Sequence, residues 1–154
     1  MDDLRAMMRR FPHGVAVLTV DADGEKLGLT IGSLVSLSLE PPMVGVAIAR
    51  QAAMHELLRR AGGFSLSLLA DGQDWLAQHF ARGVPPIALW QGIASREGTD
   101  GAPLLVGAFG WIECRLADEV AVGDHTLFVG QVLSVELGEA APPLVHIDSG
   151  YRTL

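Results

Sequence analysis

Alternation of hydrophobic and polar residues is the dominant pattern along this chain, and it predicts a protein built mainly from β-strands. Two alternating segments flank Asp23-Gly24, a dipeptide that favours the tight turn of a β-hairpin. Short apolar runs bounded by glycine, proline or charged residues predict the remaining strands. The seven predicted strands are the two of the hairpin within residues 15–33, followed by 41–49, 64–70, 108–118, 126–136 and 143–147.

Helical spacing of apolar residues occurs in three places. A short amphipathic helix near the start is predicted by apolar residues at i, i+3, i+4 and i+7, which are Leu4, Met7, Met8 and Phe11. A second helix is predicted over residues 54–61, where Gly62-Gly63 is typical of a helix end. Residues 73–81 predict a third helix, with Asp71 as its N-terminal cap.

The order of these elements predicts the fold class. The strands are too clustered for a regular βαβ alternation, and the short connections favour antiparallel neighbours. We therefore expect a mainly β protein, an antiparallel barrel or closed sheet with helices inserted after the third and fourth strands. A flat open sheet is the alternative. Residues 1–154 are expected to form a single domain, because this length suits one hydrophobic core.

Composition and charge exclude several classes of function. The net charge of −7 and the lack of a basic stripe argue against a nucleic-acid partner. No apolar run approaches the ~18 residues of a membrane-spanning helix, and the first residues, MDDLRAMMRR, do not resemble a signal peptide. Cys114 is the only cysteine, which excludes an intrachain disulfide and fits a reducing compartment. A cytoplasmic protein is expected.

Common catalytic motifs are missing. The chain has no G-x-G-x-x-G or P-loop segment for nucleotide phosphates and no G-x-S-x-G nucleophile elbow. His55-Glu56 begins like a zinc-protease helix, but Arg59 stands where the second histidine is needed, so no metal site is expected. A general acid–base pair among the scattered Asp, Glu and His residues stays open, but their spacing does not single one out.

Two polar segments are candidates for a site. Residues 28–42 place several hydroxyls between two strands, where a bend could direct them and free N–H groups at a phosphate or a flat heterocycle; these are Thr30, Ser33, Ser36 and Ser38. The alternative is a turn whose serines bond their own backbone. The second segment is Asp124-His125 at the start of a strand. Neighbours on a strand point to opposite faces, so we expect these two side chains not to pair. For His125, the alternative to a site role is a core histidine bonded to a backbone carbonyl.

The segment FPHGVAVLTVDADGEKLGLTIGSLVSLSLEPPMVGVAI resembles the opening of the flavin reductase-like, FMN-binding split-barrel family. The resemblance lies in a phenylalanine and glycine before the first strand, a Gly-x-Thr-x-x-Ser segment and a Ser-Leu-x-Pro-Pro turn. It continues through WIECRL at 111–116 and GDHTLFVGQV at 123–132 to the terminal Gly150-Tyr151-Arg152. It therefore covers essentially the whole chain.

This resemblance implies an antiparallel split β-barrel that forms a homodimer with flavin near the subunit interface. It also implies an NAD(P)H-dependent flavin oxidoreductase, which transfers a hydride from NADH or NADPH to FMN, or to FAD, and supplies reduced flavin to a partner monooxygenase. Two alternatives stay open. One is a flavin-binding or electron-carrier module without reductase turnover, and the other is a non-flavin dimeric barrel protein.

The resemblance also assigns candidate site residues. It implies that Thr30, Ser33 and Ser36 line the flavin ring and ribityl chain, and that His125 lies near the flavin ring and the nicotinamide. The phosphate position corresponds to the segment that contains Arg50, Gln51, Ala52 and Met54. Tyr151 and Arg152 are expected to close the pocket edge, with His13 near its rim. The chain departs from the family pattern, which usually has Asn at Gly32, hydroxyl residues within 51–54 and Asn at Ser67. Fewer donors imply loose flavin binding, as in a reductase that uses flavin as a diffusible substrate, or a divergent protein without the activity.

Overall fold

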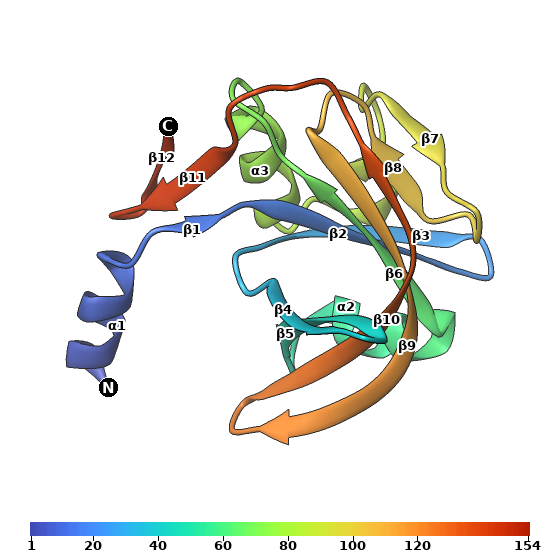
Figure 1. The fold of residues 1–154 in the computed structure, drawn as a ribbon, viewed down its shortest axis with the longest axis horizontal. Helices are drawn as coiled ribbons and strands as arrows, with labels where there is room; N and C mark the ends of the chain where they lie inside the picture. Colours follow the sequence, from blue (N-terminus) through green and yellow to red (C-terminus); the bar gives the residue numbers. More distant parts are fainter.

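The main sheet of the computed structural model, which describes residues 1–154, contains seven strands in the order β3-β2-β6-β9-β10-β5-β4 (Figure 1). All neighbouring strands are antiparallel, as the sequence predicts. β3 and β4 are the two ends of the hydrogen-bonded order, so the ladder is not continuous around a barrel. The strands are β2 (Ala16–Ala22), β3 (Glu25–Ile31), β4 (Val35–Leu39), β5 (Pro42–Ala49), β6 (Gly63–Leu68), β9 (Gly110–Val122) and β10 (His125–Leu137).

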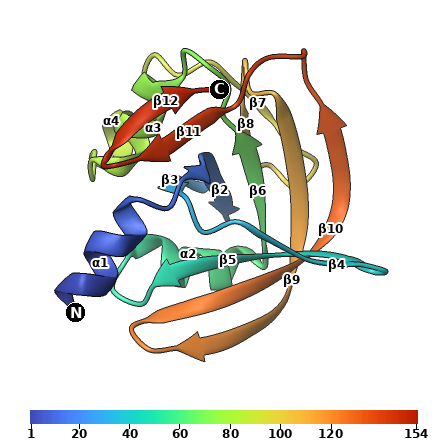
Figure 2. The ribbon, with the colours of Figure 1, turned by 60° about the vertical axis from the view of Figure 1, so that its left-hand side comes forward.

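The two longest strands, β9 and β10, join the halves of this sheet. β9 pairs with β6 from Gly110 to Arg115, whereas β10 pairs with β5 from His125 to Gln131. The β9–β10 ladder carries two register shifts, between Val129 and Gly130 and between Val132 and Ser134. Such irregularities bend a strand pair, and Figure 2 shows both strands curving around the fold. This curvature turns the sheet into a split barrel and not the flat sheet that was the alternative.

Five short strands were not predicted from the sequence. β1 (His13–Gly14), β11 (Leu144–Ile147) and β12 (Gly150–Thr153) form a three-stranded sheet in the order β1-β11-β12, of which only β11 was expected. β7 (Ser95–Glu97) and β8 (Pro103–Leu105) form a two-stranded sheet within a segment that carries loop signals. β4 also occupies the region where we expected a bend, and it pairs with β5 through a bulge between Ser36 and Ser38.

Four helices accompany the sheets: α1 (Asp2–Arg9), α2 (Ala53–Ala61), α3 (Asp74–Ala81) and the unpredicted α4 (Pro86–Leu89). α2 and α3 follow β5 and β6, which are the predicted insertion points. Gly62 ends α2 in the left-handed conformation, at φ 71°, as the sequence indicated. The predicted cap of α3 is wrong. Gln73, and not Asp71, is the N-cap residue, and it makes no side-chain cap bond. The Asp71 carboxylate accepts a hydrogen bond from the Thr153 hydroxyl on β12.

Two apolar clusters make up the core. The larger lies inside the curved main sheet and includes Leu18, Phe64 and Phe128 with α2 residues such as Leu58. The second packs the other side of β2 against α3 and α4. Unlike these elements, α1 has no buried residue, and it is held by the hydrogen bond from the Asp148 amide to the Arg9 carbonyl, 2.7 Å. Its predicted apolar face is therefore exposed. No helix in the structure combines the length and the apolar character needed to cross a membrane.

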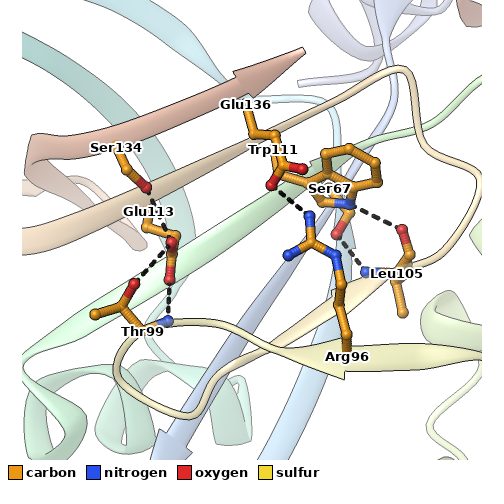
Figure 3. A network of polar contacts seen from close by, with 8 residues as sticks. All are labelled: Ser67, Arg96, Thr99, Leu105, Trp111, Glu113, Ser134 and Glu136. Atoms are coloured by element: carbon orange, nitrogen blue, oxygen red, sulfur yellow. Dashed lines mark hydrogen bonds and ion pairs between the residues drawn. The ribbon is translucent and has the colours of Figure 1, made fainter. Parts of the chain in front are cut away.

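Polar side chains fix β7 and β8 to the outer face of β6 and β9 (Figure 3). The buried Glu113 carboxylate accepts hydrogen bonds from the Thr99 amide at 2.6 Å and the Ser134 hydroxyl at 2.9 Å. The Leu105 amide donates to the Ser67 hydroxyl at 2.9 Å. Further out, Arg96 lies over the Trp111 ring and forms an exposed ion pair with Glu136. The same network thus contains one buried and one exposed carboxylate.

Candidate functional site

The hydroxyl-bearing segment at the end of β3 and after it uses its first two hydroxyls for hydrogen bonds within the protein. Thr30 Oγ1 donates to the Ala77 carbonyl on α3 at 2.6 Å. Ser33 Oγ donates to the Ala47 carbonyl at 3.1 Å and accepts from the Ala47 amide at 3.0 Å. These two bonds hold the β3–β4 connection against β5. This matches the alternative of a hydrogen-bonded turn. Ser36 on β4 is exposed and pairs in register with Val44, so its hydroxyl is available at the surface.

The predicted phosphate segment connects β5 to the start of α2. Arg50 and Gln51 are exposed, and the Arg50 amide donates to the Asp124 carbonyl at 3.0 Å. Ala52 has extended backbone angles and is the N-cap of the nine-residue helix, without a side-chain cap bond. The first amides of a helix lack partners within the helix and carry its positive dipole end. This segment therefore offers backbone donors and one arginine where hydroxyls are missing.

A cavity of about 270 Å³ lies beside this helix start, and most of its lining residues are hydrophobic. Ala52 and Met54 line one side, and the β3 residues Gly28 and Leu29 line another. Phe80 packs against Gly28 so closely that a Cβ there would lie 2.7 Å from the phenyl ring. The cavity is thus a narrow apolar slot bounded by β3, α2 and the end of α3.

His125 and Asp124 pair with each other, contrary to the expectation from the sequence. His125 Nδ1 lies 2.7 Å from Asp124 Oδ1. The expectation was wrong because β10 begins at His125, so Asp124 belongs to the turn after Gly123, at φ 57°, and is outside the strand alternation. The hydrogen bond and charge of His125 lower the pKa of Asp124, and Arg50 adds to the effect. Since an ionised carboxylate only accepts, Nδ1 carries the hydrogen, and the other ring nitrogen is left for a ligand.

His125 is not a core histidine. Its side chain is 44% exposed, and its Cα is in register with Ala49 at the end of β5. The strand pairing therefore places His125 beside the residue that precedes Arg50. The structure brings these two predicted site residues together at one end of the β5–β10 ladder. A neighbouring buried contact links His55 on α2 to the Thr126 hydroxyl at 2.7 Å, which fixes the helix against the strand.

A second cavity, of about 170 Å³, lies at the end of β3 and contains Thr30, Gly32 and Tyr151. His13 and His146 complete its polar lining, and an adjacent cavity of about 200 Å³ also contacts His13 and Gly32. The sequence analysis placed Tyr151 at a pocket edge and His13 at its rim, but it missed His146. Nothing in the apolar stretch around His146 distinguishes it from an ordinary strand residue.

Arg152 does not join Tyr151 in this cavity. It lines a neighbouring groove with Asp71 and Asp74, and Tyr151 contributes to both hollows. Its guanidinium donates to the Tyr151 carbonyl at 3.0 Å. The candidate site therefore has three parts: the slot beside Ala52 and Met54, the ladder end with Arg50 and His125, and the cavity that Thr30 shares with Tyr151.

The site holds no activated nucleophile. Cys114 is fully buried between β6 and β10, and burial raises the pKa of its thiol to about 12. No cluster of three or more histidine, cysteine or acidic side chains is arranged to hold a metal ion. The chemical groups available are backbone amides, apolar walls, imidazoles and a phenol. Such an arrangement can bind and orient flat heteroaromatic rings, and the reactive atoms would belong to those ligands.

Comparisons with known proteins show which family the chain resembles in sequence and fold. The family described as "Flavin reductase like domain" matches residues 8–154. The chain is 42% identical over 147 residues to the reductase component of 4-hydroxyphenylacetate 3-monooxygenase from Thermus thermophilus, covering 96% of this chain and 92% of that protein. It is 36% identical to the NADH:FMN oxidoreductase of Rhodococcus erythropolis, covering 97% and 80%. The solved NADH:FAD oxidoreductase of Streptomyces globisporus superposes with a TM-score of 0.93 at 34% identity, covering 98% and 91%.

Proposed function

The chain belongs to the flavin reductase-like domain family, and we propose that it is an NAD(P)H-dependent flavin oxidoreductase. In the reaction, a hydride passes from NADH or NADPH to FMN, or to FAD. The observation that carries this proposal is the combination of a family match over residues 8–154 with a site of cavities and ring-binding groups that lacks a nucleophile. Both reactive centres belong to the nucleotides, and the protein contributes position and exclusion of water.

The residues present fit a flavin. The slot of about 270 Å³ is lined by Gly28 and Phe80 and by the first residues of α2. The helix amides there, with Arg50 just before the helix, suit a phosphate. We assign Gln51, Ala52 and Met54 to this end. We assign Thr30 to the neighbouring cavity, which it lines, and Ser33 and Ser36 to the segment after β3, where Ser36 has an exposed hydroxyl. When bound, flavin supplies the hydride acceptor.

His125 is the proposed polar group at the reacting end of the site. Asp124 fixes its Nδ1 tautomer, so the other ring nitrogen is the one left for a ligand. A histidine at this place can donate a hydrogen bond where negative charge develops during hydride transfer. Tyr151 closes the far cavity, and Arg152 serves the outer groove at the same edge.

FMN is the proposed flavin, with FAD as the alternative, and NADH or NADPH is the donor. The relatives include both an NADH:FMN and an NADH:FAD oxidoreductase, so the family accommodates either flavin. The uncapped α2 start and the lack of hydroxyl side chains at 51–54 favour weak binding of the phosphate. Weak binding fits flavin as a diffusible substrate, released in its reduced form.

We also propose a homodimer. Four apolar residues on α1 or just after it are each more than half exposed, at 51–64%: Leu4, Met7, Met8 and Phe11. Further exposed apolar residues lie on β4 and the end of β10: Val35, Leu37, Leu39, Leu133, Val135 and Leu137. Patches of this kind mark subunit contacts more often than free surface. Residues 1–154 act in this proposal as one domain.

A monooxygenase that consumes reduced flavin is the proposed partner, because a relative at 42% identity is the reductase component of such an enzyme. We place the protein in the cytoplasm, where a thiol such as that of Cys114, the only cysteine, stays reduced. The reduced flavin would pass between the two proteins by diffusion, in keeping with the exposed, weakly capped phosphate position.

Anaerobic mixing of the purified protein with FMN and NADH tests the proposed activity. We expect NADH oxidation and loss of the yellow flavin colour in proportion to protein concentration, with FAD and NADPH as comparison substrates. FMN binding without NADH oxidation would replace the proposal by a flavin-binding or electron-carrier module. A protein that binds neither FMN nor FAD would be a non-flavin barrel.

A further inference from the structure

Three aromatic side chains with polar atoms line the cavity at the end of β3. His13 comes from β1, His146 from β11 and Tyr151 from β12, and residues 30–32 at the end of β3 also line the cavity. The imidazoles of His13 and His146 are stacked, with ring centroids 5.0 Å apart and an angle of 28° between planes. Tyr151 meets His146 edge-on, at 5.2 Å. The cavity of about 170 Å³ is therefore walled by a row of rings.

Gly32 makes this arrangement possible. The imidazole of His13 fills the space in which a side chain at position 32 would lie. An ideal Cβ on Gly32 would be 2.7 Å from Nε2 of His13 and closer still to two other ring atoms. The ring is thus held between the Gly32 backbone and His146, and His13 and Gly32 depend on each other.

The polar atoms of the three rings are largely unused within the protein. His13 Nδ1 lies 2.8 Å from the Gly14 carbonyl, which can only accept, so Nδ1 carries a hydrogen. A proton added to His13 must therefore go to Nε2, which has no partner in the protein. Neither His146 nor the Tyr151 hydroxyl takes part in a side-chain hydrogen bond. Three ring-borne polar groups are available to one ligand.

The two imidazoles cannot readily be charged together. Two positive rings 5.0 Å apart disfavour each other, and burial together with the His13 charge lowers the pKa of His146. Other charged groups on the surrounding elements are Arg9 and Arg10 on α1, Asp148 in the β11–β12 turn, Arg152 on β12, and Asp74 on α3. None of them forms an ion pair or side-chain hydrogen bond with either imidazole. The stacking of the two rings therefore favours one charged imidazole at a time.

We propose that this cavity is a binding subsite for a planar heteroaromatic ring bearing carbonyl groups, and that His13 and His146 donate one shared proton to it. The inference rests on the proposed function, which supplies two such rings, those of flavin and of nicotinamide. A hydrogen bond from a charged donor is stronger than one from a neutral donor. Ligand binding consequently draws a proton onto the pair, and bound ligand stabilises the protonated state.

Nuclear magnetic resonance titration of the imidazole signals tests this directly, with FMN and NAD⁺ as separate probes. We expect the pKa of the pair to rise by about one unit or more when the correct probe saturates the protein, which corresponds to roughly tenfold tighter binding to the protonated form. In His13→Gln the pKa of His146 should rise without ligand, because its charged neighbour is gone. His79→Gln is the matched control: that imidazole bonds the Leu89 carbonyl at 2.7 Å, and its removal should leave the titration of the pair unchanged.

Gly32→Ala provides an independent variant, because its methyl group should displace the His13 ring and reproduce the His13→Gln titration. A shift with FMN alone or with NAD⁺ alone identifies which ring occupies the subsite. Probe binding with an unchanged pKa of the pair overturns this inference and leaves the reductase proposal intact. Failure of the wild-type protein to bind either probe overturns both.

Discussion

Replacing the buried carboxylate of Glu113 by alanine should destabilise the protein far more than removing its exposed neighbour Glu136. Glu113 is 9% exposed and accepts three hydrogen bonds, from the Thr99 amide at 2.6 Å, the Ser134 hydroxyl at 2.9 Å and the Thr99 hydroxyl at 3.3 Å. Hydrogen bonds to a charged group contribute about 1.5–3 kcal/mol each. The two short bonds therefore predict a loss of about 3–6 kcal/mol in the free energy of unfolding for Glu113→Ala.

Two further variants make the comparison quantitative. Glu113→Gln keeps one acceptor oxygen and the volume, so its expected loss is about 1–2 kcal/mol. Glu136→Ala removes an ion pair to Arg96 whose side chains are 57% and 44% exposed, and such pairs contribute about 0–1 kcal/mol. Both carboxylates help to hold the β7–β8 segment in the same network (Figure 3). Comparing the two alanine variants therefore shows how much of the lost stability comes from burial of the carboxylate and how much from membership of the network alone.

Urea unfolding followed by tryptophan fluorescence is the appropriate assay, because Trp111 lies in this network. Protein concentration must be equal for all variants, since association would change the apparent stability. The reasoning is refuted if Glu113→Ala and Glu136→Ala unfold at the same urea concentration with the same slope. That result would mean that water replaces the carboxylate without cost, and that the covering segment is not anchored through Glu113.

Three other outcomes follow from the structure. His125→Ala should slow flavin reduction about tenfold or more while far-ultraviolet circular dichroism stays unchanged; an unaltered rate would remove this residue from the site. Cys114, with a pKa of about 12, should resist thiol reagents at pH 8 until the protein unfolds, because almost none of it is thiolate. Rapid labelling of the native protein would contradict its burial. Gly130→Ala should lower the free energy of unfolding by about 1–3 kcal/mol through overpacking, because its Cβ would lie 2.6 Å from Phe64 and 2.8 Å from Cys114; chemical denaturation measures this loss.

The sequence pattern predicted the elements that bury one face. The hairpin around Asp23-Gly24, the helix ended by Gly62 and the long strands at 108–118 and 126–136 all follow from periodicity and turn chemistry. The strands that it missed have little burial pattern. β7, for instance, is fully exposed over its three residues, and β4 has only one residue that is not exposed. Their pairing depends on partners far away in the chain, which local periodicity does not encode.

Prediction of the site was limited by the same non-local geometry. Thr30 and Tyr151 were predicted as site residues and do share a cavity, but the bond of Thr30 to Ala77 depends on where α3 packs. The Asp124–His125 pair was misjudged because the strand begins one residue later than the alternation argument assumed. His146 became visible as a candidate only when the three-stranded sheet placed it on His13. It was therefore easier to predict which residues belong to a site than to predict which partners they contact.

β4 is the edge strand at one end of the main sheet, and an open edge affects self-association of the protein at high concentration. Its outer edge has unpaired backbone groups beside the exposed Val35, Leu37 and Leu39, a combination that invites strand addition and aggregation. This strand contains no lysine, a residue that often prevents edge-to-edge pairing. The bulge between Ser36 and Ser38 and the prolines that follow interrupt a regular ladder instead. Strand addition along this edge, as distinct from the subunit contact proposed for the apolar side chains of β4, is thus limited by backbone shape, and added salt should have little influence on it.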